Sequence, residues 1–184
     1  LYPLTKTIGK HMLPIGDEPM IYRALSHFQK SKSIEEVMII VSPEGAGQTM
    51  ECVGSGKEWN LDVSFKIQES PDGIADALLL CESFVGKDKC TVFLGDSIFK
   101  KSLHPEIDAF YQENRNGCHL FLWPVSDPER FGVATLENDK IIEIVEKPAN
   151  PKSNLSVAGV YCYDNTVFQR IKKLSPSQRG ELEI

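Results

Sequence analysis

Several features that mark whole classes of protein are missing from this chain. Its 184 residues contain no apolar run long enough to span a membrane and no signal peptide. Beyond the Lys172-Lys173 pair no basic cluster stands out, and the net charge of −6 disfavours a nucleic-acid partner. Neither C-x-x-C nor H-x-x-x-H spacing occurs, which argues against a structural zinc site. We therefore expect neither a membrane nor a nucleic acid among the partners.

The cysteines are few, odd in number and widely spaced. Most lie in apolar runs, and the five positions are Cys52, Cys81, Cys90, Cys118 and Cys162. Dispersed cysteines with apolar neighbours indicate buried free thiols rather than a disulfide framework. We predict a reducing compartment, and hence a cytoplasmic protein.

The chain does contain enough apolar material for one well-buried core, with 41% hydrophobic residues. Apolar residues at helical spacing follow Pro19, and the continuous run Val37-Met-Ile-Ile-Val41 after them is typical of a strand buried on both faces. The alternation continues with a helix between 45 and 56, a strand over 63–67, a helix over 74–84 and a strand over 90–94. Helices alternating with strands predict a parallel sheet wrapped by helices.

The pattern changes in the second half of the chain. A helix over 105–114 and a strand over 118–125 precede two strands, 131–136 and 140–146, that flank Glu137-Asn-Asp139 as a hairpin. A strand over 157–163 and a helix over 165–174 follow. We predict a single α/β domain over residues 1–184, Rossmann-like with a mostly parallel sheet, carrying an antiparallel β insertion.

Three polar positions stand out before any family is considered. Lys10 lies between Gly9 and a turn rich in proline and glycine, so it can present a fixed charge to a phosphate, although a solvated loop lysine explains the same pattern. Asp96 directly follows a strand, where ligands bind in open α/β sheets; it can hold Mg²⁺ or merely cap the next segment. The Pro71-Asp-Gly73 turn can expose backbone N–H groups before a helix.

A series of ordered motifs resembles those of the sugar-1-phosphate nucleotidylyltransferases, most of all the glucose-1-phosphate thymidylyltransferases. The motifs run from Leu1 to Ile184 without a large gap. They are Leu1-Tyr-Pro-Leu-Thr5, Lys10-His-Met-Leu-Pro-Ile15, Gln68-Glu-Ser-Pro-Asp-Gly73, Leu94-Gly-Asp-Ser-Ile-Phe99, Asp127-Pro-Glu-Arg-Phe-Gly-Val133, Ile144-Val-Glu-Lys-Pro148, Lys152-Ser-Asn-Leu-Ser-Val-Ala-Gly-Val-Tyr161 and Ser175-Pro-Ser-Gln-Arg-Gly-Glu-Leu-Glu-Ile184. The resemblance implies a fold of the nucleotide-diphospho-sugar transferase type.

The resemblance also implies roles for individual residues. At the nucleotide, Lys10 would act on the α-phosphate, Asp96 would hold Mg²⁺, and the Gln68 amide and Gly73 backbone would meet the base edge. Lys147 and Arg179 would be the cations on the sugar phosphate, completing a catalytic set with Lys10. The remaining implied residues line the sugar site: Gly132, Glu146, Val157, Tyr161 and Glu181.

The chain departs from the family pattern at a few places. Glu69 stands where the family has proline, Ser97 where it has asparagine, and Ala158 where it has threonine. The glycine-rich phosphate loop that precedes the family's first motif does not appear before Leu1. We therefore expect an internal piece of a longer protein, whose strands lack one central neighbour.

The activity implied is transfer of a nucleotidyl group from dTTP to glucose-1-phosphate, giving dTDP-glucose and pyrophosphate with Mg²⁺ as cofactor. Family analogy suggests a homotetramer. Thymine and uracil differ by one methyl group, which a pocket reads at only about 1–3 kcal/mol, so a UTP-dependent or other sugar nucleotidylyltransferase stays open. A catalytically silent module that binds sugar nucleotides is the alternative from another class.

Overall fold

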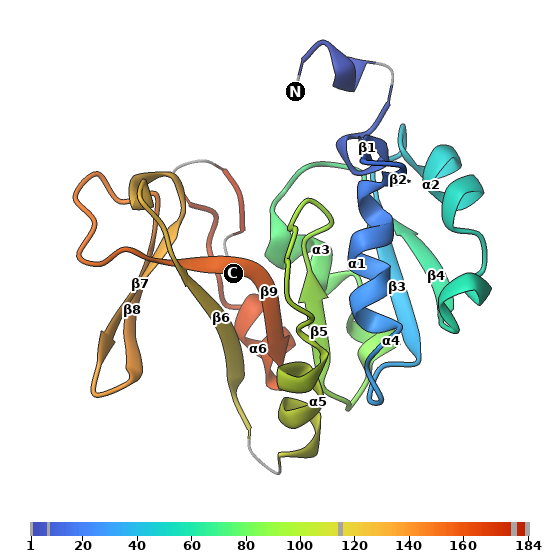
Figure 1. Ribbon diagram of the computed structural model, residues 1–184. Coiled ribbons are helices and arrows are strands. Elements are labelled where there is room, and N and C mark those ends of the chain that lie inside the picture. Colours follow the sequence, from blue (N-terminus) through green and yellow to red (C-terminus); the bar gives the residue numbers. More distant parts are fainter. Residues whose placement is uncertain (1, 7, 114–115, 178–179, 183–184) are drawn as a thin grey trace.

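The computed structural model describes residues 2–6, 8–113, 116–177 and 180–182, and Figure 1 shows the arrangement of its helices and strands. The strands are β1 Pro14–Ile15, β2 Glu18–Pro19, β3 Glu36–Val41, β4 Asp62–Ile67, β5 Cys90–Phe93, β6 Cys118–Pro124, β7 Gly132–Glu137, β8 Lys140–Glu146 and β9 Leu155–Tyr163. The α-helices are α1 Met20–Phe28, α2 Ala46–Val53, α3 Ile74–Leu79, α4 Glu82–Val85, α5 His104–Gln112 and α6 Thr166–Ile171. None of the helices in the described part of the chain has the length and apolarity needed to cross a membrane.

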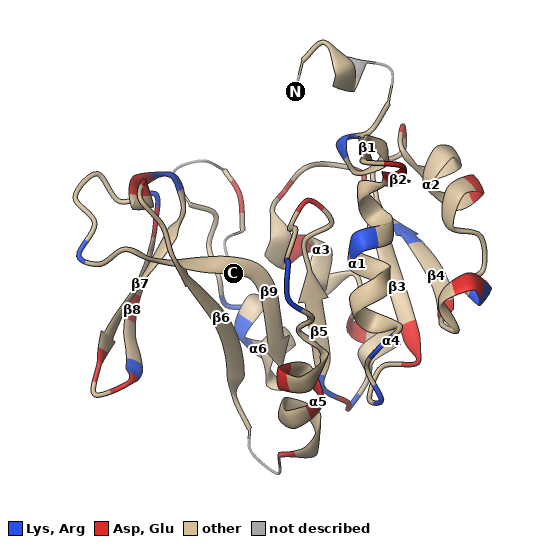
Figure 2. Ribbon diagram, in the orientation of Figure 1, with Lys and Arg blue, Asp and Glu red and all other residues tan. Residues whose placement is uncertain are grey.

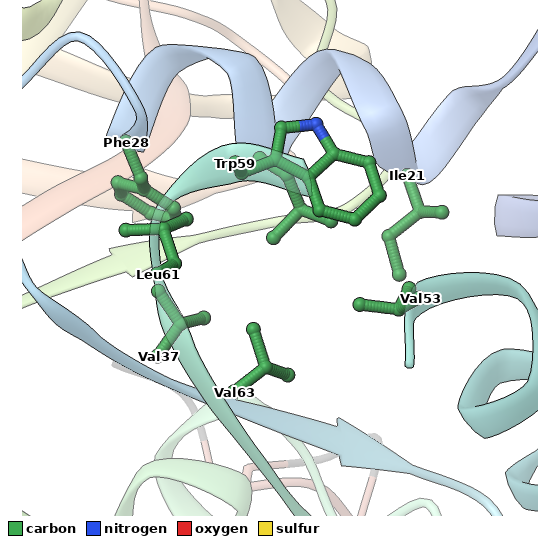
Figure 3. Packing of buried hydrophobic residues seen from close by; sticks show 8 residues of the cluster. Ile21, Phe28, Val37, Val53, Trp59, Leu61 and Val63 are labelled. Atoms are coloured by element: carbon green, nitrogen blue, oxygen red, sulfur yellow. The ribbon is translucent and has the colours of Figure 1, made fainter. Parts of the chain in front are cut away.

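Helix α1 covers one face of the β3–β4 pair. Its apolar residues recur at helical spacing, and Ile21, Leu25 and Phe28 are all buried. They pack on Val37 of β3 and Val63 of β4, together with residues of the segment that joins α2 to β4 (Figure 3). The helix predicted after Pro19 is therefore confirmed, with its apolar stripe against the sheet.

Strand β3 is covered on both faces, as its continuous apolar run predicts. Val37 and Ile39 face the α1 cluster. Met38 and Ile40, which alternate with them, face a second cluster built on α3 and α6, where Phe168 is almost fully buried. β3 runs parallel to β4 in a register that starts at the Glu36–Asp62 pair.

Strand β9 organises the second sheet. β6 pairs antiparallel with β9 along its length, from Cys118–Tyr163 to Pro124–Leu155. β5 pairs antiparallel with residues 160–163 of β9, and β7 pairs antiparallel at Ser156. Because a strand has only two edges, β5 and β7 share the edge of β9 opposite β6.

The predicted α/β class and the antiparallel insertion are confirmed. Among the described strands parallel pairing is confined to β3 and β4, since β9 reverses the direction of every ladder it joins. The helix predicted over 74–84 is wrong in one respect, because it is two helices, α3 and α4. The Cys81 N–H donates to the Leu78 carbonyl, and this tighter i to i−3 bond interrupts the α-helical pattern.

The β7–β8 hairpin forms as its turn residues predict. Asn138 and Asp139 both have positive φ, 49° and 58°, which is the backbone of a type I′ turn. Asparagine and aspartate tolerate that conformation better than other residues with a Cβ atom. In Figure 1 the hairpin projects as an arm away from α1 and β3.

All five cysteines are free thiols. Cys81, Cys90 and Cys162 are buried, as predicted, and burial raises the pKa of the Cys90 thiol to about 12. Cys118 is exposed, contrary to the prediction from its apolar neighbours. Cys118 is exposed because it is the first residue of β6 and lies at the end of the sheet.

A cavity of about 1270 Å³ lies between β3 and β5. Its walls include residues 36–40 of β3 and residues 90–93 of β5, with Leu25 and Phe28 of α1. In the described part of the chain these two strands are not paired with each other. The central strand neighbour that the family resemblance implies stays a prediction.

Asp108 joins α5 to the turn that follows α1. Its buried carboxylate accepts hydrogen bonds from Ser31 Oγ at 2.5 Å, from the Lys32 N–H at 3.1 Å and from the Ser33 N–H at 3.2 Å. Burial by itself would raise the pKa of Asp108, but the bonds from Ser31, Lys32 and Ser33 outweigh burial and lower it. The ionised carboxylate therefore stabilises the fold.

We predict that Asp108→Asn lowers the free energy of unfolding by about 1–3 kcal/mol at neutral pH, because donors of the turn lose a charged acceptor. Folding lowers the Asp108 pKa below its ordinary 3.8, so the stabilisation is complete above that value and disappears as the pH falls through the folded-state pKa. Denaturant unfolding between neutral pH and about pH 3 should show the wild-type and variant curves converging. The exposed Asp88 provides the control, and Asp88→Asn should leave stability unchanged at every pH.

Candidate active site

An ion pair between distant parts of the chain marks the site. Lys10 opens a short 3-10 helix, Lys10–Met12, and its Nζ lies 2.6 Å from Oδ2 of Asp96, the third residue after β5 ends at Phe93. Both side chains are close to half exposed. Burial alone would raise the pKa of Asp96, but the hydrogen bond and charge of Lys10 lower it, so the carboxylate stays ionised. The predicted cation and the predicted metal ligand thus lie together.

The loop that carries Asp96 rests directly on the backbone of β9. The Leu94 N–H donates to the Gly159 carbonyl at 2.8 Å. A Cβ atom placed on Gly159 would lie 2.1 Å from Ser97 Oγ and 3.0 Å from Leu94 Cδ1. Position 159 therefore excludes any side chain, and Gly159 sets how closely the Asp96 loop approaches the sheet.

The turn that follows β4 forms the second part of the site. Gln68 continues β4 by donating its N–H to the Val41 carbonyl at 2.9 Å. Gly73 has a φ of +107°, and a Cβ atom there would lie 2.5 Å from the Leu182 carbonyl oxygen. Leu182 in turn donates its N–H to the Asp72 carbonyl at 2.8 Å. The turn is therefore fastened to the C-terminal segment by backbone contacts.

One cavity brings these groups together. The cavity between β3 and β5 extends along both strands to their carboxyl ends, and its lining includes five of the predicted site residues: Lys10, Gln68, Gly73, Asp96 and Glu181. Loops at the carboxyl ends of parallel strands are where ligands bind in open α/β sheets. Arg179, the second predicted cation on the sugar phosphate, lies outside the described residues.

The predicted sugar residues form a second group at the base of the hairpin. Gly132 pairs with Glu146 across β7 and β8, and a Cβ atom on Gly132 would lie 3.1 Å from Glu146 Oε2. Lys147 Nζ lies 3.3 Å from Glu146 Oε1, and the Lys147 backbone has a φ of +45°. The Lys147 N–H donates to the Phe131 carbonyl at 2.9 Å, which holds that uncommon conformation in place.

Strand β9 lies between the two groups. Val157, Gly159 and Tyr161 are partly buried, whereas Val160 and Cys162 are fully buried. Burial, then the charge of Glu146 and that of Asp96, raise the pKa of Tyr161. Its hydroxyl is therefore neutral and lies within electrostatic reach of a carboxylate from each group.

The charges near the site are few and of both signs. Figure 2 shows basic and acidic residues interspersed over the ribbon, without a large region of one sign. Any phosphate site in the described part of the chain would therefore depend on single cations held in place, such as Lys10 and Lys147, rather than on a broad positive surface. The sequence motifs identified both lysines but did not identify Gly159. A glycine in the middle of a nine-residue strand could have indicated this position, because such a glycine often marks a close backbone contact.

Comparison with known proteins places the chain in one family. The family described as nucleotidyl transferase matches residues 1–184. Glucose-1-phosphate thymidylyltransferases of Neisseria meningitidis and Xanthomonas campestris are 38% and 39% identical to the chain over its whole length. The chain spans 64% and 62% of those two relatives.

Solved structures give the same picture. A Bacillus anthracis protein, provisionally named a glucose-1-phosphate thymidylyltransferase and crystallised in complex with a sucrose, is 46% identical with a TM-score of 0.91. The match covers 98% of this chain and 72% of that one. A UDP-glucose pyrophosphorylase in complex with UDP-glucose is 23% identical with a TM-score of 0.80, covers 100% of this chain and 78% of its own, and shares the fold.

We predict that Gly159→Ala lowers the free energy of unfolding by about 1–3 kcal/mol, because the new methyl group forces Ser97 and Leu94 off β9. Adding Ser97→Gly should restore part of the loss by removing the nearer contact. Gly47→Ala is the control, since nothing lies within 4 Å of the added atom. Denaturant unfolding of the three variants measures the effect, and a Gly159→Ala protein as stable as the wild type would contradict it.

Proposed function

We propose, because the chain belongs to the nucleotidyl transferase family, that the protein transfers a nucleotidyl group from dTTP to glucose-1-phosphate, forming dTDP-glucose and pyrophosphate. The observation that carries the proposal is the meeting of Lys10, Asp96 and the Gln68–Gly73 turn around one cavity. A cation, a carboxylate and an amide at one opening can serve the phosphates, a metal ion and the base of a nucleoside triphosphate. The names of the relatives support the choice of thymidine and glucose.

In the proposed reaction a phosphate oxygen of glucose-1-phosphate attacks the α-phosphorus of dTTP in line. The new P–O bond joins the two phosphates while the bond to the bridging oxygen breaks, and pyrophosphate leaves with that electron pair. The chain contributes position and charge rather than covalent chemistry. Lys10 stabilises the charge on the α-phosphoryl oxygens, and its contact with Asp96 keeps the ammonium group beside the place of reaction.

Asp96 fits the role of a Mg²⁺ ligand. Its carboxylate is ionised and partly exposed at the cavity. Within the described ranges no three His, Cys, Asp or Glu side chains gather into a group that could hold a metal ion. Mg²⁺ is commonly held by one or two carboxylates plus substrate phosphates, so one carboxylate suits an ion that arrives with the triphosphate. Bound there, Mg²⁺ would neutralise phosphate charge.

The group at the base of the hairpin is assigned to the sugar phosphate. Lys147, with Arg179, would orient the attacking phosphate without neutralising it completely. The Glu146 carboxylate can accept hydrogen bonds from sugar hydroxyls, and the bare backbone at Gly132 leaves room beside it. The rest of the sugar surface is assigned to the apolar side chain of Val157, the neutral hydroxyl of Tyr161 and the polar side chain of Glu181.

A pyrophosphate-release assay of the full-length protein tests the proposal. dTTP, UTP, CTP, ATP and GTP are each combined with glucose-1-phosphate and with other sugar phosphates. We expect the fastest release from dTTP with glucose-1-phosphate. A clear preference for UTP would assign the protein to the uridylyl alternative, and binding of sugar nucleotides without release would identify a silent binding module.

Lys10→Ala should reduce kcat by about 10²-fold or more, because a charge directed at the reacting phosphorus acts mainly in the transition state. Binding of glucose-1-phosphate should change little. Lys100→Ala, which removes an exposed lysine close to Asp96 in the sequence, is the matched control. Steady-state kinetics at saturating substrates provide the measurement, and an unchanged kcat would remove Lys10 from the mechanism.

Lys147→Ala should raise the KM for glucose-1-phosphate by roughly tenfold or more while changing the KM for dTTP little, since the lost contact is to the sugar phosphate. Lys152→Ala is the control on the same arm of the structure, because Lys152 pairs with Glu143 of β8 instead. Equal weakening of both substrates would indicate that Lys147 supports the hairpin rather than the ligand.

A further inference from the structure

The side chain of Gln68 is held in one orientation by two neighbours. Its Nε2 lies 2.8 Å from Oδ2 of Asp76 and 3.2 Å from the Gly73 carbonyl oxygen. A carboxylate and a backbone carbonyl can only accept hydrogen bonds, so the amide nitrogen must face them. Both partners therefore select the same one of the two possible amide orientations.

This orientation decides which end of the amide is available to a ligand. Gln68 lines the cavity between β3 and β5, whereas Asp76, on α3, is not among the described residues that line it. The nitrogen is thus directed toward α3, and the opposite, carbonyl end of the amide is the one that can face the cavity. A glutamine held in this way presents an acceptor only.

We propose that Asp76 is a positioning residue that makes the site select pyrimidine bases with a protonated ring nitrogen, N3–H, at their pairing edge. The inference rests on the proposed function, in which Gln68 meets the base. Thymine and uracil present the N3–H donor to the Gln68 Oε1 acceptor. Cytosine presents an unprotonated N3, which is also an acceptor, so the two lone pairs face each other.

The restraint matters because glutamine alone discriminates poorly. A free amide can turn by half a rotation and offer its NH₂ group to cytosine as readily as its oxygen to thymine. With Asp76 in place that rotation breaks a charge-assisted hydrogen bond and sets the amide oxygen against a carboxylate. Gln68 therefore selects between bases only because Asp76, which does not itself touch the base, fixes the orientation of its amide.

A competing explanation gives Asp76 a purely structural role. It lies in the first turn of α3, where a negative charge stabilises a helix. Losing that role would lower stability and weaken all nucleotides alike. Only the positioning role changes the preference between two pyrimidine bases, so the dTTP to dCTP ratio separates the two explanations.

The test uses the full-length protein and its Asp76→Ala and Asp76→Asn variants. kcat/KM is measured for dTTP and dCTP, and calorimetry gives the affinity for each nucleotide independently of turnover. We expect Asp76→Ala to reduce the dTTP to dCTP ratio by about tenfold in both measurements, with kcat at saturating dTTP within about twofold of wild type. Asp76→Asn should lie between, because its side-chain carbonyl still accepts a bond from Gln68.

Glu69→Gln is the control for the loss of a negative charge beside Gln68 and should leave the ratio unchanged. If the wild type prefers dTTP and the ratio is the same in Asp76→Ala, the positioning role is overturned and the proposed function stands. An equal loss for both nucleotides, with a lower melting temperature, also overturns it in favour of the structural role. A wild type that neither binds nor uses dTTP in preference to dCTP overturns this inference, and failure to release pyrophosphate from any triphosphate overturns the proposed function.

Discussion

The pairing of β9 is the constraint on which the rest of the structure depends. One nine-residue strand joins β6 along one edge and both β5 and β7 along the other. β5 leads into the Asp96 loop, and β7 begins at the predicted sugar residue Gly132. The distance between the Lys10–Asp96 pair and the Glu146–Lys147 pair is therefore set by strands that are hydrogen-bonded to β9, and the proposed function would depend on that alignment.

Close backbone approach is the second constraint. The Asp96 loop lies on Gly159, and the turn after β4 lies against Leu182 at Gly73. In each case a single Cβ atom would fall within 2.5 Å of its neighbour, so the contact exists only because glycine is there. Both contacts fasten a loop bearing a site residue to a distant segment, which holds each loop in one position before any ligand binds.

Charge is balanced locally within the site. Lys10 pairs with Asp96, and Lys147 pairs with Glu146, so each cation lies beside a carboxylate with both side chains about half exposed. Exposed pairs of this kind contribute little to stability, about 1 kcal/mol or less, so a phosphate can compete for either lysine. The same contacts that hold Lys10 and Lys147 in place thus leave both lysines able to exchange partners.

The sequence by itself determined the elements and the order of the motifs. Two sequence patterns correctly predicted which residues are buried: the helical spacing of Ile21, Leu25 and Phe28, and the apolar run of β3. Such patterns are sufficient because the face of a helix or strand that packs against the core depends on the local sequence alone. The motifs located Lys10, Gln68 and Asp96, although their contacts could not be read from them. Only the tertiary structure decided that β9 runs antiparallel to its neighbours, that Lys10 meets a carboxylate 86 positions away and that Asp76 orients Gln68. The physical reason is that side-chain periodicity is local, whereas strand partners and hydrogen-bond partners are chosen by packing among segments distant in the chain.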